Sequence, residues 1–391
     1  MSSARVTARV EESVKSDGVN DDQSLYLIKG DNSSIPLEVA QSKDRKIRPL
    51  KLFNTKKYVI VNFDRWNSRR LMFGETNCTL VMMRKTDGAM FCAESDLHCD
   101  PRWDTCDDNT VQTDASGDLI YTIQNGTVQK LDMRDPRNLT VTNVIENGVD
   151  GGANELAVNA SGDALVVFSS SNGKRYMRAY NSHGGMTNLG YGWSYQTCLV
   201  SGQDKDAERF YYVDSMLGAV VQVDRIDGKF SQSIYYNYLL NGDRYSGFDC
   251  RAGSARITRV TDHIYVRPNT PGILVDLINP DHQPKEIVLP EIQELKKMVG
   301  SNSEVLLSGV NERGDSLLLS FNSVTSEFAT LVPAGMYSFT AIGLSPNGTA
   351  SFSGQRFSDS ARVVAEIASG SLKIKVTSFD FGQVSQIVQI F

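Results

Sequence analysis

The sequence predicts an all-β protein, a β-propeller of seven four-stranded units, with eight units as the alternative. Three observations support this fold class. A phrase of strand and turn residues recurs about every 46 residues, its turns carry the residues that tight hairpins need, and helix signals are nearly absent. Four-stranded units of this length bury their apolar faces by stacking around an axis.

The recurring phrase is clearest at Asp114–Asp135, which reads DASGDLIYTIQNGTVQKLDMRD. Its first half returns as NASGDALVVF, NERGDSLLLSF and SPNGTASFSG, which start at Asn159, Asn311 and Ser345. Its second half returns as GAVVQVDRID and GILVDLINPD, which start at Gly218 and Gly272. The glycines of the second turn are separated by 47, 45 and 54 residues at Gly126, Gly173, Gly218 and Gly272. Near-regular spacing over this length of chain predicts stacked repeats.

Local chemistry predicts that each repeat contains a hairpin. Ser-Gly-Asp and Asn-Gly supply the positive φ angles of tight turns, and Val, Ile, Leu and Tyr dominate the flanking runs. One helix is expected, an insertion at Pro290–Gly300, with Pro at its start, Gly at its stop and apolar side chains on one face. The count becomes eight if residues 24–57 form a full unit.

These phrases resemble a known family of repeats. SPNGTASFSG, NASGDALVVF and DASGDLIYTI look like the strand-turn-strand phrase of PD40 repeats in TolB-like periplasmic propellers. GTVQKLDMRD is similar to the third strand of YVTN-type and BamB-like propellers. The resemblance covers most of residues 60–370, and it implies the propeller fold and a bacterial envelope setting.

The two ends of the chain differ in composition. Residues 1–23 are poor in aromatic side chains, so we expect a disordered tail or membrane tether there and a propeller over residues 24–391. Propellers commonly close with strands from both termini, which predicts that QVSQIVQIF at the C-terminus joins SLYLIKG at Ser24–Gly30 in one unit. No run of residues is long and apolar enough to span a bilayer. The formal net charge of −6 argues against a nucleic-acid partner.

Six cysteines predict an oxidising compartment, which is periplasmic, outer-membrane-associated or extracellular. Their spacings are too wide for a typical zinc site, and free thiols are the alternative. Six cysteines allow fifteen connectivities. Cys78 and Cys92 would lie on consecutive strands of one hairpin, Cys99 and Cys106 close a short loop, and the remaining two are about one repeat apart. We therefore expect the pairs Cys78–Cys92, Cys99–Cys106 and Cys198–Cys250.

One acidic stretch, Asp96–Asp108, is a candidate calcium loop. Asp96, Asp100 and Asp104 would supply oxygen ligands, although the order of residues is not that of a known calcium loop. The alternative is a solvated loop between units. No other cofactor is expected.

Aromatic clustering is the best indication of a binding surface. Ten of the fifteen tyrosines lie between Tyr176 and Tyr245. Tyrosine, tryptophan and arginine are enriched at recognition surfaces, and tyrosine is also a good strand former that packs in cores. The candidate binding residues are Tyr191, Trp193, Tyr195, Tyr235, Tyr236, Tyr238 and Arg244, with Trp66 and Arg69 as a second, smaller cluster.

No catalytic residues are assigned, because no nucleophile motif, histidine pair or singled-out pair of carboxylates occurs. The sequence therefore predicts a non-catalytic binding or scaffold module that docks a protein partner. The alternative is a glycan-active or other hydrolytic enzyme with acidic residues in a central channel.

Overall fold

A computed structural model of the chain provides the structure. It describes residues 6–14, 20–29, 34–36, 49–55, 57–63, 71–73, 76–78, 80–86, 89–93, 111–124, 126–135, 140–145, 151–170, 175–192, 199–202, 207–214, 217–237, 257–260, 262–268, 270–279, 281, 283–345, 348–367, 374–378 and 383–389.

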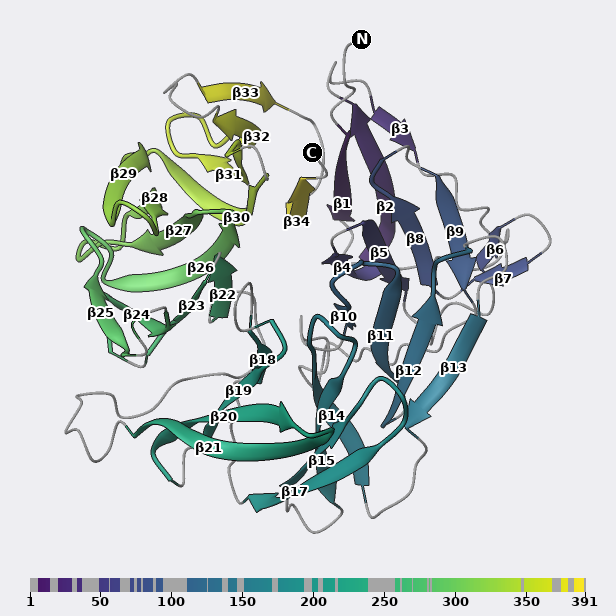
Figure 1. Cartoon of the computed structure of the whole chain (residues 1–391). Coiled ribbons are helices and arrows are strands. Elements are labelled where there is room, and N and C mark those ends of the chain that lie inside the picture. Colours follow the sequence, from purple (N-terminus) through teal and green to yellow (C-terminus); the bar gives the residue numbers. More distant parts are fainter. Residues whose placement is uncertain are drawn as a thin grey trace.

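The described strands form eight four-stranded antiparallel sheets and one two-stranded hairpin (Figure 1). The first sheet contains strands from both ends of the chain, β34 (Gln383–Gln389), β1 (Val6–Val14), β2 (Asn20–Lys29) and β3 (Ser34–Pro36). The second contains β4 (Pro49–Asn54), β5 (Tyr58–Phe63), β8 (Leu80–Arg84) and β9 (Met90–Ala93). A small hairpin interrupts it, β6 (Leu71–Phe73) with β7 (Thr76–Cys78).

The next three sheets follow chain order. The third contains β10 (Val111–Thr113), β11 (Leu119–Gln124), β12 (Thr127–Asp132) and β13 (Thr140–Ile145). The fourth contains β14 (Gly151–Val158), β15 (Ala164–Ser170), β16 (Arg175–Tyr180) and β17 (Met186–Gly192). The fifth contains β18 (Val200–Ser201), β19 (Phe210–Asp214), β20 (Ala219–Ile226) and β21 (Lys229–Asn237).

The last three sheets have the same strand order. The sixth contains β22 (Ile257–Val260), β23 (His263–Val266), β24 (Ile273–Ile278) and β25 (Lys285–Val288). The seventh contains β26 (Glu294–Ser301), β27 (Glu304–Val310), β28 (Ser316–Asn322) and β29 (Glu327–Val332). The eighth contains β30 (Tyr337–Leu344), β31 (Ala350–Arg356), β32 (Arg362–Ile367) and β33 (Ile374–Ser378).

The sheets follow one another around the molecule in chain order, and their first strands contact each other (Figure 1). β10 contacts β14, β14 contacts β18, β22 contacts β26, β26 contacts β30, and β30 contacts β34. β34 also contacts β4. The first strand of each sheet is therefore the inner one, and β34 supplies the inner strand of the sheet that joins the two ends of the chain.

That joining sheet agrees with the expected closure and adds a strand to it. The C-terminal segment and Ser24–Gly30 contribute to the same sheet, but β1 lies between them and pairs directly with β34. Residues 6–14 were expected in a disordered tail, and here they form an inner part of the sheet. A segment that is too polar to fold alone can still be ordered by a ladder of backbone hydrogen bonds on both of its edges.

Neighbouring sheets bury their apolar faces against each other. One cluster joins Tyr121 and Val128 to Val166 across two sheets, and the next joins Leu165 to Phe210. This layering is how a propeller buries hairpins that would be marginal alone.

Two of the repeated turns, Asn159–Asp163 and Asn311–Asp315, share one geometry. In Asn159–Asp163 the side chain of Asn159 accepts the Asp163 N–H at 2.9 Å, and Gly162 has φ 77°. Asn311–Asp315 repeats the arrangement, with a bond of 2.9 Å and φ 83° at Gly314. An amide oxygen that caps the turn and a glycine that tolerates positive φ explain why this phrase recurs.

The expected helix at Pro290–Gly300 is wrong, because this segment contains the start of strand β26. Leu295 and Met298 are both buried there, at a spacing typical of helices. A β-bulge between Leu295 and Lys297 inserts one residue into the strand and shifts its alternation by one position. The bulge therefore imitates helical periodicity.

Candidate functional site

The two faces of the ring carry different kinds of connection. In an antiparallel four-stranded sheet, the connections from strand one to two and from three to four leave at one end, and all others leave at the opposite end. We call the first end the turn face and the second the loop face. On the turn face lie short turns such as 114–118, 159–163, 181–185 and 345–349. The four longest connections all join strand ends at the loop face, and they are 37–48, 64–79, 94–110 and 238–256.

Most of the predicted site residues belong to connections of the loop face. Nine of these candidates lie outside the described residues: Trp66, Arg69, Asp96, Asp100, Asp104, Trp193, Tyr195, Tyr238 and Arg244. Four of the cysteines, Cys99, Cys106, Cys198 and Cys250, lie outside them too. The strands that flank them are described, and these strands end at the loop face. Connections that are far apart in the sequence therefore start and end on the same side of the molecule.

Two candidate tyrosines have a packing role. Tyr235 and Tyr236 of β21 are partly buried against the core cluster of Val200, Tyr211 and Val220. The ring of Tyr235 meets that of Tyr211 edge-on, with 5.4 Å between centroids. Their role in binding stays a prediction. Tyr191 lies in β17 opposite Tyr176 of β16.

The first expected disulfide has a different setting from the predicted hairpin. Cys92 is in β9 opposite Val81, whereas Cys78 ends β7 instead of lying in the preceding strand β8. β7 contacts β9, so the two backbones are near each other. All three bridges stay predictions, and mapping of peptides under non-reducing conditions tests them.

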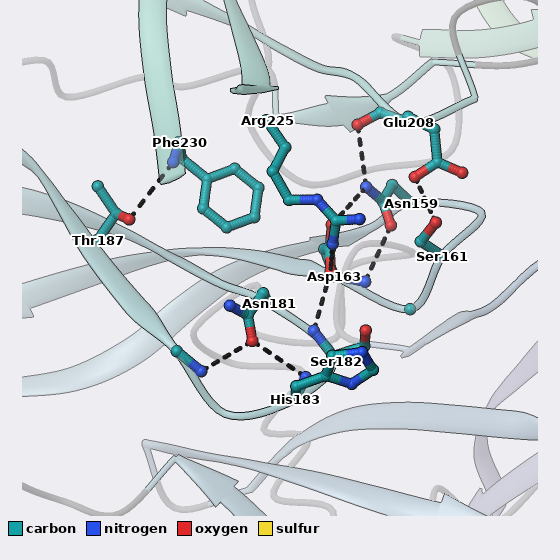
Figure 2. A network of polar contacts seen from close by, with 12 residues as sticks. Asn159, Ser161, Asp163, Asn181, Ser182, His183, Thr187, Glu208, Arg225 and Phe230 are labelled. Carbon is teal, nitrogen blue, oxygen red and sulfur yellow. Dashed lines mark hydrogen bonds and ion pairs between the residues drawn. The ribbon is translucent and has the colours of Figure 1, made fainter. Parts of the chain in front are cut away.

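The densest described polar network lies on the turn face, between the fourth and fifth sheets (Figure 2). Asp163 is fully buried, and Arg225 Nη1 donates to both of its carboxylate oxygens at 2.9 Å. The Ser182 N–H donates to Asp163 Oδ1 at 2.8 Å, and Asn159 Nδ2 donates to Oδ2 at 3.2 Å. A permanent cation and two further N–H donors therefore offset the desolvation of this carboxylate.

The same network ties the two sheets together by a second route. Asn159 Nδ2 also donates to the carbonyl oxygen of Glu208 at 2.9 Å, and the Ser161 hydroxyl donates to the Glu208 carboxylate. The Ala160 N–H donates to the Ala207 carbonyl at 2.9 Å. We call the contacts of Asn159, Asp163, Ser182, Glu208 and Arg225 the clasp. The clasp holds a seam between sheets, and every group in it has a structural partner.

A second buried acid lies in the sixth sheet, between β23 and β24. Asp276 Oδ2 is 2.8 Å from His263 Nδ1, and the Asp276 side chain is only 6% exposed. Burial raises the pKa of Asp276 to about 6, against the opposing influence of His263. The imidazole is stacked on Tyr265, whose ring meets Phe321 of the next sheet edge-on. The pair is thus part of the packing between two sheets.

Sequence reasoning missed both buried acids. A signal existed for Asp163, because it is the last residue of a recurring N-x-x-G-D turn. None marked the His263–Asp276 pair, since 13 residues and a bulge separate its members. Within the described ranges, no group of three or more His, Cys, Asp or Glu side chains could hold a metal ion. The calcium candidates Asp96, Asp100 and Asp104 are outside those ranges, so calcium binding there stays a prediction.

Comparison with solved structures identifies the fold. AztD from Citrobacter koseri superposes with a TM-score of 0.53 at 12% identity, covering 99% of this chain and 98% of that chain. The chain is a β-propeller. A prolyl endopeptidase matches with a TM-score of 0.52 at 12% identity, covering 90% of the propeller chain and 55% of the peptidase. At this identity the likeness concerns the fold alone.

No protein-family model matches the propeller, and no curated protein sequence matches it. Among its described residues there is no helix long and apolar enough to cross a membrane.

Proposed function

We propose that this propeller is a non-catalytic module that docks a protein partner through its loop face, in a bacterial envelope or an extracellular complex. The observation that carries the proposal is the asymmetry of the two faces. The longest connections join strand ends at the loop face, and the connections of this face contain most of the aromatic, arginine and acidic residues that the sequence singles out. Binding residues commonly lie on loops that a rigid scaffold positions.

The turn face suits the role of a rigid base. Its described turns satisfy their own backbone groups, and the clasp ties two sheets together there. Conformational entropy lost on docking is smallest when the scaffold is already ordered. An ordered turn face therefore suits a protein that binds its partner through the connections of the opposite face.

The ends of the chain support a tether on the side away from the partner. β1 begins and β34 ends at the turn face, where Thr7 is paired with Gln389. A membrane anchor at the N-terminus would thus leave the loop face pointing outward. The proposal also includes an envelope location, three disulfides and calcium binding at the acidic connection 94–110. These three points are expectations from the sequence.

Site-specific cross-linking tests the proposal. A photoreactive side chain at position 193 or 238 should capture one partner from envelope extract, whereas the same group at His183, which is exposed in a turn-face turn, should not. Trp193→Ala should then weaken binding of that purified partner roughly 30-fold, as loss of an anchor worth ~2 kcal/mol does. A matched control is His183→Ala, which should bind normally.

Equal capture from both faces would overturn the docking surface. Turnover of polysaccharide or peptide substrates by the purified chain, with no captured partner, would favour the enzyme alternative instead.

A further inference from the structure

The His263–Asp276 pair lies at the seam between the sixth and seventh sheets. Tyr265 and Leu274, two positions along from His263 and Asp276, belong to a core cluster that includes Leu307 of the seventh sheet. The ring of His263 is parallel to that of Tyr265, with 5.7 Å between centroids. A change in the charge of this pair therefore acts directly on the packing of one sheet against the next.

The two carboxylates that are buried among the described residues have opposite electrostatic settings. Asp163 is bonded to Arg225, a cation that does not titrate in the physiological range. Asp276 has one bond, to a histidine, and its other oxygen Oδ1 is buried without a hydrogen-bond partner among the described residues. Burying a carboxylate with so little compensation is costly, and the cost is relieved when the group takes up a proton.

The charged and titratable neighbours of Asp276 come from two strands and a turn. His263 and Tyr265 belong to β23, Lys285 to β25 and Asp281 to the connection between β24 and β25. From the seventh sheet, Phe321 packs on Tyr265 and Ser323 hydrogen-bonds to it, and neither carries a titratable group. Lys285 is already paired with Asp281. His263 is therefore the titratable side chain in direct hydrogen-bond contact with Asp276.

We propose that Asp276, hydrogen-bonded to His263, is a pH-sensitive latch that holds the seam most tightly when its carboxyl group is protonated. When the carboxyl group ionises, a buried negative charge remains with one oxygen unbonded among the described residues. This proposal does not depend on the docking function.

The sign of the effect follows from the direction of the pKa shift. A carboxyl whose pKa is higher in the folded state than in the unfolded state contributes stability below its unfolded value, and that contribution is lost as the pH rises through the folded value. Burial raises the pKa of Asp276 from 3.8 to about 6. The latch should therefore loosen as the pH rises through about 6.

Hydrogen exchange measured from about pH 5 to about pH 8 tests the latch. After correction for intrinsic exchange, the opening constant of amides in β24 and β27 should rise roughly tenfold across this range, because about one pH unit separates pH 5 from the folded pKa of Asp276 at about 6. Amides of β15 and β16, beside the clasp, should show no such rise. Asp276→Asn should abolish the rise, whereas the control Asp281→Asn, at an exposed acid of the same sheet, should keep it.

A second variant keeps the test decisive if Asp276→Asn folds poorly. His263→Gln removes the group that opposes the rise in the pKa of Asp276, so the pH midpoint for seam opening should move upward from the wild-type value. The latch is refuted if Asp276→Asn retains the pH dependence, if the midpoint stays in place in His263→Gln, or if β15 and β16 open in parallel with the seam.

Discussion

Breaking the clasp between Asp163 and Arg225 should cost a large part of the stability of the propeller. In Arg225→Met, the carboxylate of Asp163 stays fully buried and keeps only the N–H donors of Ser182 and Asn159. Removing one partner of a buried pair costs about 3–5 kcal/mol. A third of the Arg225 side chain is exposed, so solvent screens part of the interaction and we expect the lower end, ~3 kcal/mol.

Urea denaturation followed by tryptophan fluorescence measures this loss. Asp163→Asn should lose a similar free energy of unfolding. Its amide nitrogen would carry hydrogens that point at the N–H groups of Arg225 and Ser182, so those groups would lose an acceptor. A double mutant should lose less than the sum of the two single mutants, by roughly 1–3 kcal/mol. Arg313→Met, at an exposed arginine in an equivalent turn, should stay within about 0.5 kcal/mol of wild type.

Two results would refute this reasoning. Additive losses in the double mutant would mean that Asp163 and Arg225 stabilise the fold separately. A loss below about 1 kcal/mol in Arg225→Met would mean that the two N–H donors and water suffice to solvate the carboxylate.

Three further predictions concern backbone contacts. Gly126→Ala should lower the melting temperature by several degrees more than Gly228→Ala. Both glycines have positive φ, but a Cβ at Gly126 would lie 2.6 Å from the Gly152 Cα, whereas Gly228 faces open space. Equal shifts of the two melting temperatures in calorimetry would contradict this contact. Deleting residues 383–391 should produce aggregation in light scattering, because it removes the inner strand β34 and exposes the edge of β1. Deleting residues 1–19 removes β1 and should also destabilise the ring, whereas a tail would be removable at no cost.

Local chemistry made the hairpins predictable. Asn159–Asp163 and Asn311–Asp315 were expected to be turns, and both have the capped geometry with a positive φ glycine. Such turns depend on interactions within five residues, which a sequence displays directly. The period of the repeat also predicted that the hairpins stack as propeller units, but it left their number open between seven and eight.

Segments whose structure depends on distant strands were not predictable in this way. β1 was expected to be a tail because its own composition cannot bury much apolar surface, and its order comes from β34 at the other end of the chain. At Leu295 and Met298, a bulge gave a strand the spacing of a helix. In both segments, tertiary pairing outweighed the local pattern.

The amino-acid sequence by itself determined the repeat, its turns, the all-β class and which residues are rich in aromatic and acidic chemistry. Only the tertiary structure decided that the strands flanking most of those residues end at one face, that Asp163 meets Arg225 from 62 residues away, and that His263 meets Asp276 at a seam. The physical reason is that turn geometry is a local property of the chain. The partners of a buried charge, in contrast, are set by how whole sheets stack, and no window of sequence contains that information.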